Sequence, residues 1–287
     1  MTDSGGNQQT VTAAFSTAGS YFTPVTPTRI LDTRSGTGVA KAGPVAPNAT
    51  IKLKIAGVDG LPQSGVTAVA LNVTATEATK LGVITAYPDG ASLPEVSNID
   101  FHANQNVANT VIVAVGADGY VDLANLSSGT THVIADLEGY YSANGESGFT
   151  SIDPARVLDT RKTTAVPAGG TVKVNLGSYT GISAATFNMT VVDATGNGYI
   201  TASPDGGSTP TTSNVNYLAG QTVPNEVVVA VGPFLYGVVV PPAAECGVSA
   251  QVGDQGGEVG VFGGSGQVGA EVADGLAGHP LPVESAV

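Results

Sequence analysis

The residues of this chain best suited to chemistry are its arginines. All four lie in two six-residue blocks, RILDTR at 29–34 and RVLDTR at 156–161, and each block holds an aspartate between its two arginines. A guanidinium group holds a carboxylate through two parallel hydrogen bonds, so each aspartate is a natural partner for its neighbours. We favour this structural interpretation; the alternative is that the arginines bind a ligand carboxylate or a sugar acid of a cell envelope. The candidate residues for either role are Arg29, Asp32, Arg34, Arg156, Asp159 and Arg161.

Two Pro-Asp-Gly sequences, at 88–90 and 204–206, are typical of tight turns. Proline fixes one φ angle and glycine supplies a positive one, as such turns require. Together with Asp118, Asp122 and Asp136, the turn aspartates could offer oxygen ligands to calcium, but the regular spacing of a dedicated calcium loop is missing. We therefore expect no cofactor, with calcium as the alternative.

The arginine blocks belong to a longer internal repeat. Three further blocks recur in the same order: GVITAYPDG at 82–90 and GYITASPDG at 198–206, SNIDF at 97–101 and SNVNY at 213–217, VIVAVG at 111–116 and VVVAVG at 227–232. Because the order of the blocks is kept, the chain consists of two tandem copies of one domain.

Alternation of apolar and polar residues predicts half-buried strands in both copies. Ile51, Leu53 and Ile55 alternate with two lysines, and no segment shows an apolar period of 3.6 residues. Turns rich in Gly, Pro and Asn separate the candidate strands. The sequence predicts an all-β fold of two tandem β-sandwich or jelly-roll-like domains. In the first copy we expect strands near 28–33, 49–56, 66–76, 82–88, 97–101, 109–116, 120–126 and 131–141.

Two sequence features indicate how the strands and domains pack. The runs at 111–115 and 227–231 are apolar throughout, which is typical of a central strand covered on both faces. Aromatic residues gather at the domain ends, where we expect them to pack neighbouring domains together rather than to stack on sugars. These aromatic residues are Tyr21, Phe22, Tyr140, Tyr141 and Phe149.

The second copy stops matching the first at Gly232. Residues 233–287 are rich in glycine and contain no Lys or Arg, which suggests a frame-shifted or disordered extension. We therefore expect the second copy to lack its last two strands and to expose a sheet edge through which chains could self-associate. The expected organisation is a flexible N-terminal segment at 1–20, a complete first copy at 21–142, a linker at 143–148, a truncated second copy at 149–232 and a Gly-rich acidic tail at 233–287.

Composition and motif content exclude several function classes. A net charge of −13 would repel nucleic acid. Residues 1–20 have neither the basic start nor the apolar run of a signal peptide, and no apolar stretch is long enough to insert in a membrane. The single cysteine, Cys246, cannot form an internal disulfide. His102 and His132 are not retained in the second copy, where Leu218 takes the place of His102, so we expect no enzymatic activity.

The blocks RILDTR, GVITAYPDG, SNIDF and THVIADLEGYYS together resemble the tandem β-domains of Streptomyces and related actinobacterial secreted and cell-surface proteins. The resemblance covers roughly 21–142 in full and 149–232 in part. It implies a non-catalytic module, sometimes attached to a hydrolase, with an extracellular or cell-surface location.

We therefore expect a non-catalytic binding or spacer module that contacts envelope polysaccharide or another protein. One alternative is an accessory region of a secreted glycosidase or peptidase whose catalytic domain is not in this chain. Another is a structural assembly subunit, joined to its neighbours through the unfinished sheet of the second copy.

Overall fold

The computed structural model describes residues 20–145, 147–152, 155–176, 181–232, 236–239, 246–252 and 260–263. These residues form antiparallel sheets, and one short 3-10 turn, Thr160–Lys162, is the helical element among them. The predicted all-β fold is confirmed. No helix in this part of the chain has the length and apolar character needed to cross a membrane.

The first copy is a sandwich of two four-stranded sheets, with strand orders β1-β8-β3-β6 and β2-β7-β4-β5. Val69, Leu71 and Val73 of β3 alternate inward and share one core with Leu53 and Leu123 of the facing sheet. All eight expected strands are present: β1 (Tyr21–Asp32), β2 (Thr50–Lys54), β3 (Val66–Thr76), β4 (Gly82–Pro88), β5 (Ile99–Phe101), β6 (Val107–Ala114), β7 (Tyr120–Ser127) and β8 (His132–Ser142).

The second copy repeats this arrangement and continues beyond Gly232. Its β16 pairs with β11 and β13, as β7 pairs with β2 and β4. Likewise β17 lies between β10 and β12, and β18 between β9 and β12, so the two together take the place of β8. The strands are β9 (Gly148–Ser151), β10 (Ala155–Asp159), β11 (Thr171–Val174), β12 (Ile182–Val192), β13 (Gly198–Pro204), β14 (Val215–Tyr217), β15 (Val223–Ala230), β16 (Tyr236–Val239), β17 (Gly247–Val252) and β18 (Gly260–Gly263).

Hydrogen bonds confirm that β17 occupies the place of the first half of β8. The Thr33 hydroxyl accepts a bond from the Val133 backbone N–H at 3.0 Å, and the Thr160 hydroxyl accepts one from Val248 at 2.7 Å. Just before these strands, Thr131 bridges to Val45, and Cys246 bridges in the same way to Val166. Cys246 is therefore the counterpart of Thr131 in the core of the second copy.

The expectation that the second copy ends at Gly232 and lacks two strands is therefore wrong. Sheet pairing uses the backbone, so a segment needs only suitable inward residues, here Cys246, Val248 and Ala250, to complete the fold. β16, β17 and β18 also contradict disorder of the residues that form them, whereas a frame-shifted origin stays a prediction. The sheet edge proposed for self-association is occupied by these strands. The rest of the predicted tail lies outside the described residues.

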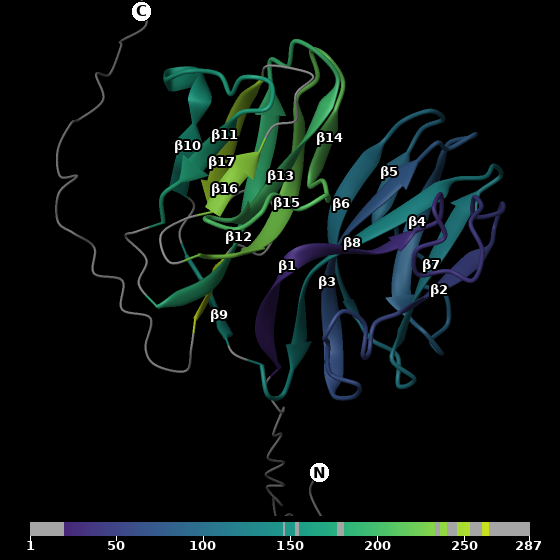
Figure 1. The fold of residues 1–287 in the computed structure, drawn as a ribbon. Coiled ribbons are helices and arrows are strands. Elements are labelled where there is room, and N and C mark those ends of the chain that lie inside the picture. Colours follow the sequence, from purple (N-terminus) through teal and green to yellow (C-terminus); the bar gives the residue numbers. More distant parts are fainter. Residues whose placement is uncertain are drawn as a thin grey trace, which may run out of the picture.

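The two copies lie side by side and meet where β15 contacts β1, β8 and β6 of the first copy (Figure 1). The contact includes an apolar cluster of Phe22, Ala70 and Tyr141 from the first copy with Ala184 and Val228 from the second. The rings of Phe22 and Tyr141 are 5.0 Å apart between centroids. The prediction that aromatic residues pack the domains together is confirmed for these two.

The apolar runs behave differently in the two copies. β6 is an edge strand, and Ile112 in its centre is 52% exposed, so the prediction of a strand covered on both faces is wrong for the first copy. The matching Val228 is only 1% exposed, because it packs against Phe22 and Ala70 of the first copy. The same sequence pattern is thus covered only where the copies meet.

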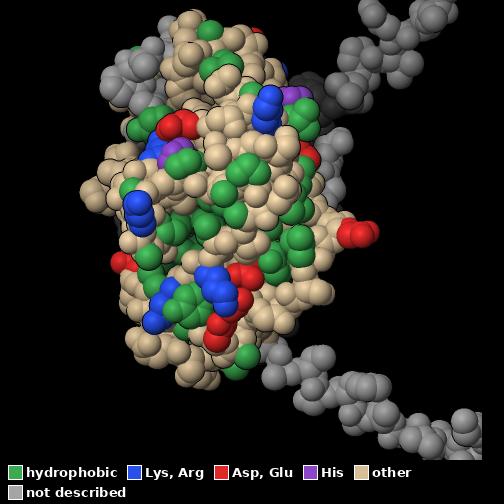
Figure 2. Space-filling view, turned by 90° about the vertical axis from the view of Figure 1, so that its right-hand side faces the viewer, with side chains coloured by type: hydrophobic (Ala, Val, Ile, Leu, Met, Phe, Trp, Pro, Cys, Tyr) green, Lys and Arg blue, Asp and Glu red, His purple; other side chains and the backbone are tan. Residues whose placement is uncertain are grey.

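On the side of the first copy that faces away from the second, charged groups lie around the margin. Figure 2 shows apolar side chains across the middle of this side, with Lys or Arg and Asp or Glu toward both ends. This distribution fits a chain in which only 11% of the residues are charged.

Candidate ligand-binding cleft between the two copies

In the first copy, the arginine block places two guanidinium groups at the end of β1. Arg29 lies opposite Asp136 of β8 in the strand register, and its Nε and Nη2 donate to the two carboxylate oxygens at 2.8 and 3.2 Å. Arg34 binds Asp32 in the same bidentate way, with its Nε and Nη2 donating to the two carboxylate oxygens at 3.0 and 2.8 Å. The hydrogen bond from Arg34 lowers the pKa of Asp32. Burial raises the pKa of Asp136, although Arg29 opposes this effect.

The second copy repeats one of these two ion pairs. Arg161 donates to both oxygens of Asp159, at 2.8 and 2.7 Å, and this lowers the pKa of Asp159 to about 2. Arg156 lies 3.8 Å from the same carboxylate. At the register position of Asp136, however, the second copy has Gln251 opposite Arg156. The structure therefore gives each Asp of the two blocks an arginine partner, and a ligand role for the arginines stays a prediction.

A cleft between the copies is lined by the first block and not by the second. One cavity of about 250 Å³ is lined on the side of the first copy by Arg29, Arg34, Thr74, Thr76, Asn106 and Ile134. Its opposite wall is Tyr199, Thr211, Thr212, Ser213 and Asn216 from the second copy. A neighbouring cavity of about 400 Å³ shares Asn106, Tyr199 and Asn216 with it. We call these two cavities the inter-copy cleft.

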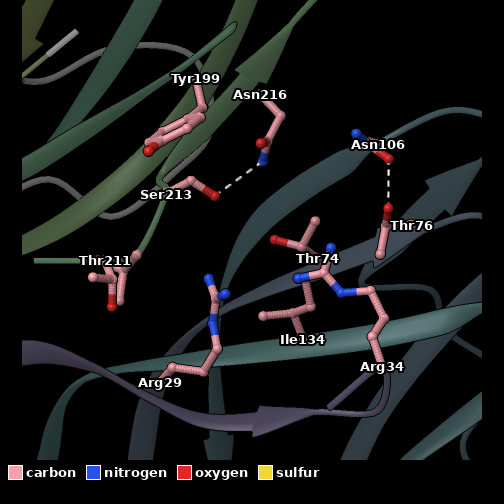
Figure 3. Close-up of a pocket in the computed structure, with 11 residues that line it drawn as sticks. Arg29, Arg34, Thr74, Thr76, Asn106, Ile134, Tyr199, Thr211, Ser213 and Asn216 are labelled. Carbon is pink, nitrogen blue, oxygen red and sulfur yellow. Dashed lines mark hydrogen bonds between the residues drawn. The ribbon is translucent and has the colours of Figure 1, made fainter. Parts of the chain in front are cut away.

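The side chains of the cleft are mostly hydrogen-bonding groups (Figure 3). The Thr76 hydroxyl donates to Asn106 Oδ1 at 2.6 Å, and Asn216 Nδ2 donates to the Ser213 hydroxyl at 3.3 Å. Both arginines point into the cavity from the first copy, facing the wall that carries Tyr199. Tyr199 is 41% exposed, so part of its ring is open to solvent.

Two hydroxyl groups of the cleft are buried without a hydrogen-bond partner. Only four buried side-chain oxygens in the described residues lack one, and two of these, Thr74 Oγ1 and Thr212 Oγ1, belong to residues that line this cavity. Thr74 is 4% exposed and Thr212 is 2% exposed. An unpaired buried hydroxyl is costly, and each wall of the cavity carries one that no group of the protein satisfies.

The walls of the cleft are fixed by a polar network beside it. Asn225 Nδ2 donates to Asn72 Oδ1 at 2.9 Å, and Asn225 Oδ1 accepts from the Thr110 backbone at 3.1 Å. Asn214 Nδ2 donates to Glu138 Oε1 at 2.8 Å. Burial raises the pKa of Glu138 well above its ordinary value, with Asp136 and Glu226 adding to the effect. The network joins β3, β6 and β8 of the first copy to β15 and to the loop before β14 in the second copy.

Two of the aspartates considered as calcium ligands pair with basic side chains. Asp136 pairs with Arg29, and the turn aspartate Asp89 lies 2.5 Å from Lys52 Nζ. Burial raises the pKa of Asp122, with the nearby Asp89 charge as a further cause. Within the part of the chain that the structure describes, no group of three His, Cys, Asp or Glu side chains could hold a metal ion.

The sequence pointed to Arg29 and Arg34 but missed the opposite wall. Tyr199 and Asn216 occupy positions held by Val83 and Asp100 in the first copy. A site formed between unlike surfaces of two repeat copies can use residues that are not the same in both copies. Positions at which the two copies have different residues were therefore the available signal for the second wall. Such positions alone do not say which surfaces of the copies meet.

No family model matches the chain, and no curated protein matches it. Among solved structures, it is similar to the N-terminal CBM22-1-CBM22-2 tandem domain of Xyn10C from Paenibacillus barcinonensis, at 8% identity and a TM-score of 0.22. That match covers 83% of this chain and 98% of the other. The coconut allergen cocosin matches at 9% identity and a TM-score of 0.17, covering 75% and 78%. At TM-scores this low, the assignment of function depends on the cleft alone.

Proposed function

We propose that the chain is a glycan-binding module and that the inter-copy cleft holds one or more sugar units. The observation that carries the proposal is the pair of buried hydroxyls without partners, Thr74 Oγ1 and Thr212 Oγ1, one on each wall. A sugar hydroxyl both donates and accepts hydrogen bonds, so it suits two threonine hydroxyls and the amides beside them.

Shape and lining support the same ligand class. The two cavities, of about 250 and 400 Å³, approach the size of small-ligand sites, which run from about 300 to 1,000 Å³. The exposed ring of Tyr199 offers an apolar face for a sugar ring, while Asn106 and Asn216 offer amide donors and acceptors. Polar side chains around one aromatic platform favour a hydroxyl-rich ligand over an apolar one.

The proposal includes binding without catalysis and a location outside the cell or on its surface. Hydroxyl, amide and guanidinium groups bind and orient a ligand by hydrogen bonds. The location is supported by the resemblance of the repeat blocks to secreted and surface domains of actinobacteria. A role beside a hydrolase on a separate domain would use the same cleft.

Replacing Thr74 or Thr212 by valine tests the cleft directly. Valine keeps the shape of threonine and removes the unpaired hydroxyl, so each variant should be about 1 kcal/mol more stable than the wild type. The same change removes a ligand contact, and glycan affinity should fall by about tenfold. Thermal unfolding and titration calorimetry with a panel of cello-, xylo-, manno- and laminari-hexaoses measure the two effects.

Thr85→Val is the matched control. The Thr85 hydroxyl is buried but donates to the Val96 carbonyl at 2.6 Å, in the sheet away from the cleft. This variant should lose about 1 kcal/mol of stability and keep its glycan affinity. Wild-type binding to no glycan of the panel, or binding unchanged by Thr74→Val, Thr212→Val and Tyr199→Ala together, would refute the proposed site.

A further inference from the structure

The two arginines of the cleft are neutralised by carboxylates that belong to the protein itself. Asp136 holds Arg29, and Asp32 lies between the two guanidinium groups, 3.6 Å from Arg29 Nη1 and 2.8 Å from Arg34 Nη2. Both aspartates are nearly buried. A third carboxylate, that of the exposed Glu77, lies 4.0 Å from Arg34 Nη1. Two positive charges therefore face three negative ones.

The guanidinium groups nevertheless keep donors for a ligand. Arg29 uses Nε and Nη2 for Asp136, and Arg34 uses Nε and Nη2 for Asp32. The Nη1 group of each arginine has no carboxylate oxygen within hydrogen-bond distance, since the nearest lie at 3.6 and 4.0 Å. Each Nη1 group carries two N–H donors. The cleft thus presents hydrogen-bond donors whose positive charge is already neutralised by carboxylates of the protein.

An uncharged acceptor fits this arrangement better than a carboxylate does. A sugar hydroxyl or ring oxygen can accept from either Nη1 group without approaching a like charge. A ligand carboxylate at the same place would meet arginines already neutralised and would lie close to Asp32, Asp136 and Glu77. Placing like charges together across an interface costs affinity.

We propose that the inter-copy cleft selects uncharged sugar units and rejects uronic acids and other acidic sugars, with Asp32, Asp136 and Glu77 as the residues that determine this specificity. The inference rests on the glycan-binding function proposed above and adds the ligand class. It also replaces the earlier alternative, in which the arginines of the first copy would bind a sugar acid.

The test compares a neutral glycan with its own acidic form. Each hexaose of the panel that carries free primary hydroxyls is oxidised at C6, which changes CH₂OH to a carboxylate and leaves the backbone intact. For any glycan that binds, oxidation should weaken binding to the full chain by more than about tenfold at low salt. The difference should shrink as salt is added, because salt screens the repulsion.

Charge-removing variants assign the selectivity to named residues. Glu77→Gln changes an exposed side chain and should raise affinity for the oxidised glycan by about threefold. Asp136→Asn keeps the shape of the side chain and should raise the affinity for the oxidised glycan further. Circular dichroism and thermal unfolding check that this variant folds. Asp118→Asn, which removes an exposed carboxylate outside the cleft, should change nothing.

The possible results separate the two proposals. Oxidised glycans that bind as well as the neutral ones would overturn the selectivity and leave the binding module standing. Selectivity that Glu77→Gln and Asp136→Asn both leave unchanged would overturn the assignment to these carboxylates. If neither form of any glycan binds, the proposed function fails and the selectivity fails with it.

Discussion

Glu138 is a carboxyl group enclosed between the two copies. It is 1% exposed and accepts from Asn214 of the second copy, with the Val228 backbone N–H also directed at it. Asp136 on its own strand and Glu226 on β15 are the neighbouring acids. Burial and these like charges disfavour ionisation and raise the pKa of Glu138 well above its ordinary value of 4.5. The contact between the copies therefore contains a group that prefers to be protonated.

Docking of the copies should weaken as the pH rises. In contact with the second copy, Glu138 binds a proton more tightly than when the copies are separated. Its contribution to the contact is therefore fully present below the ordinary pKa of 4.5 and is lost as the pH rises through the raised value. Glu138→Gln should remove most of this dependence, because a glutamine stays neutral and its amide can donate to the Thr110 hydroxyl. Small-angle scattering against pH measures the separation. A wild-type radius of gyration that stays constant with pH would contradict the assignment.

At the scale of elements, the repeat made the strands of the first copy predictable. Alternation in 51–55 placed a strand and its inward face correctly, since period two follows directly from strand geometry. The last strands of the second copy escaped prediction because CGVSAQV at 246–252 shares only two identities with THVIADL at 131–137. Backbone pairing and three small inward residues preserved the fold where side-chain identity had been lost.

Truncated chains that end before or after these strands test how much the strands stabilise the second copy. A chain ending at Gly263 keeps every described strand and should unfold like the full chain. A chain ending at Gly232 loses β16, β17 and β18, which complete both sheets of the second copy. The loss should exceed the stability of an ordinary domain, about 5–15 kcal/mol, and leave the second copy unfolded. Far-ultraviolet circular dichroism and limited proteolysis distinguish the two chains; a protease-resistant second copy in the shorter one would contradict the strand assignment.

At the scale of the whole molecule, the two copies use unlike surfaces to meet. Phe22 is fully buried by the contact, whereas its counterpart Phe149 is 42% exposed; Val228 is buried, whereas Ile112 is exposed. Self-comparison of the sequence finds the copies but gives no information on their relative placement. The arginines of the cleft could therefore be found from the sequence, and its second wall, from Tyr199 to Asn216, could not.

The position of the cleft has a consequence for how the molecule melts. Each copy has its own core, so the two could unfold in separate steps. A ligand held by Thr74 on one side and Thr212 on the other binds only when both copies are folded and in contact. Its binding free energy is then shared by both domains, and at saturating concentration two transitions would merge into one. The ligand would thus make a tandem repeat behave as a single cooperative unit.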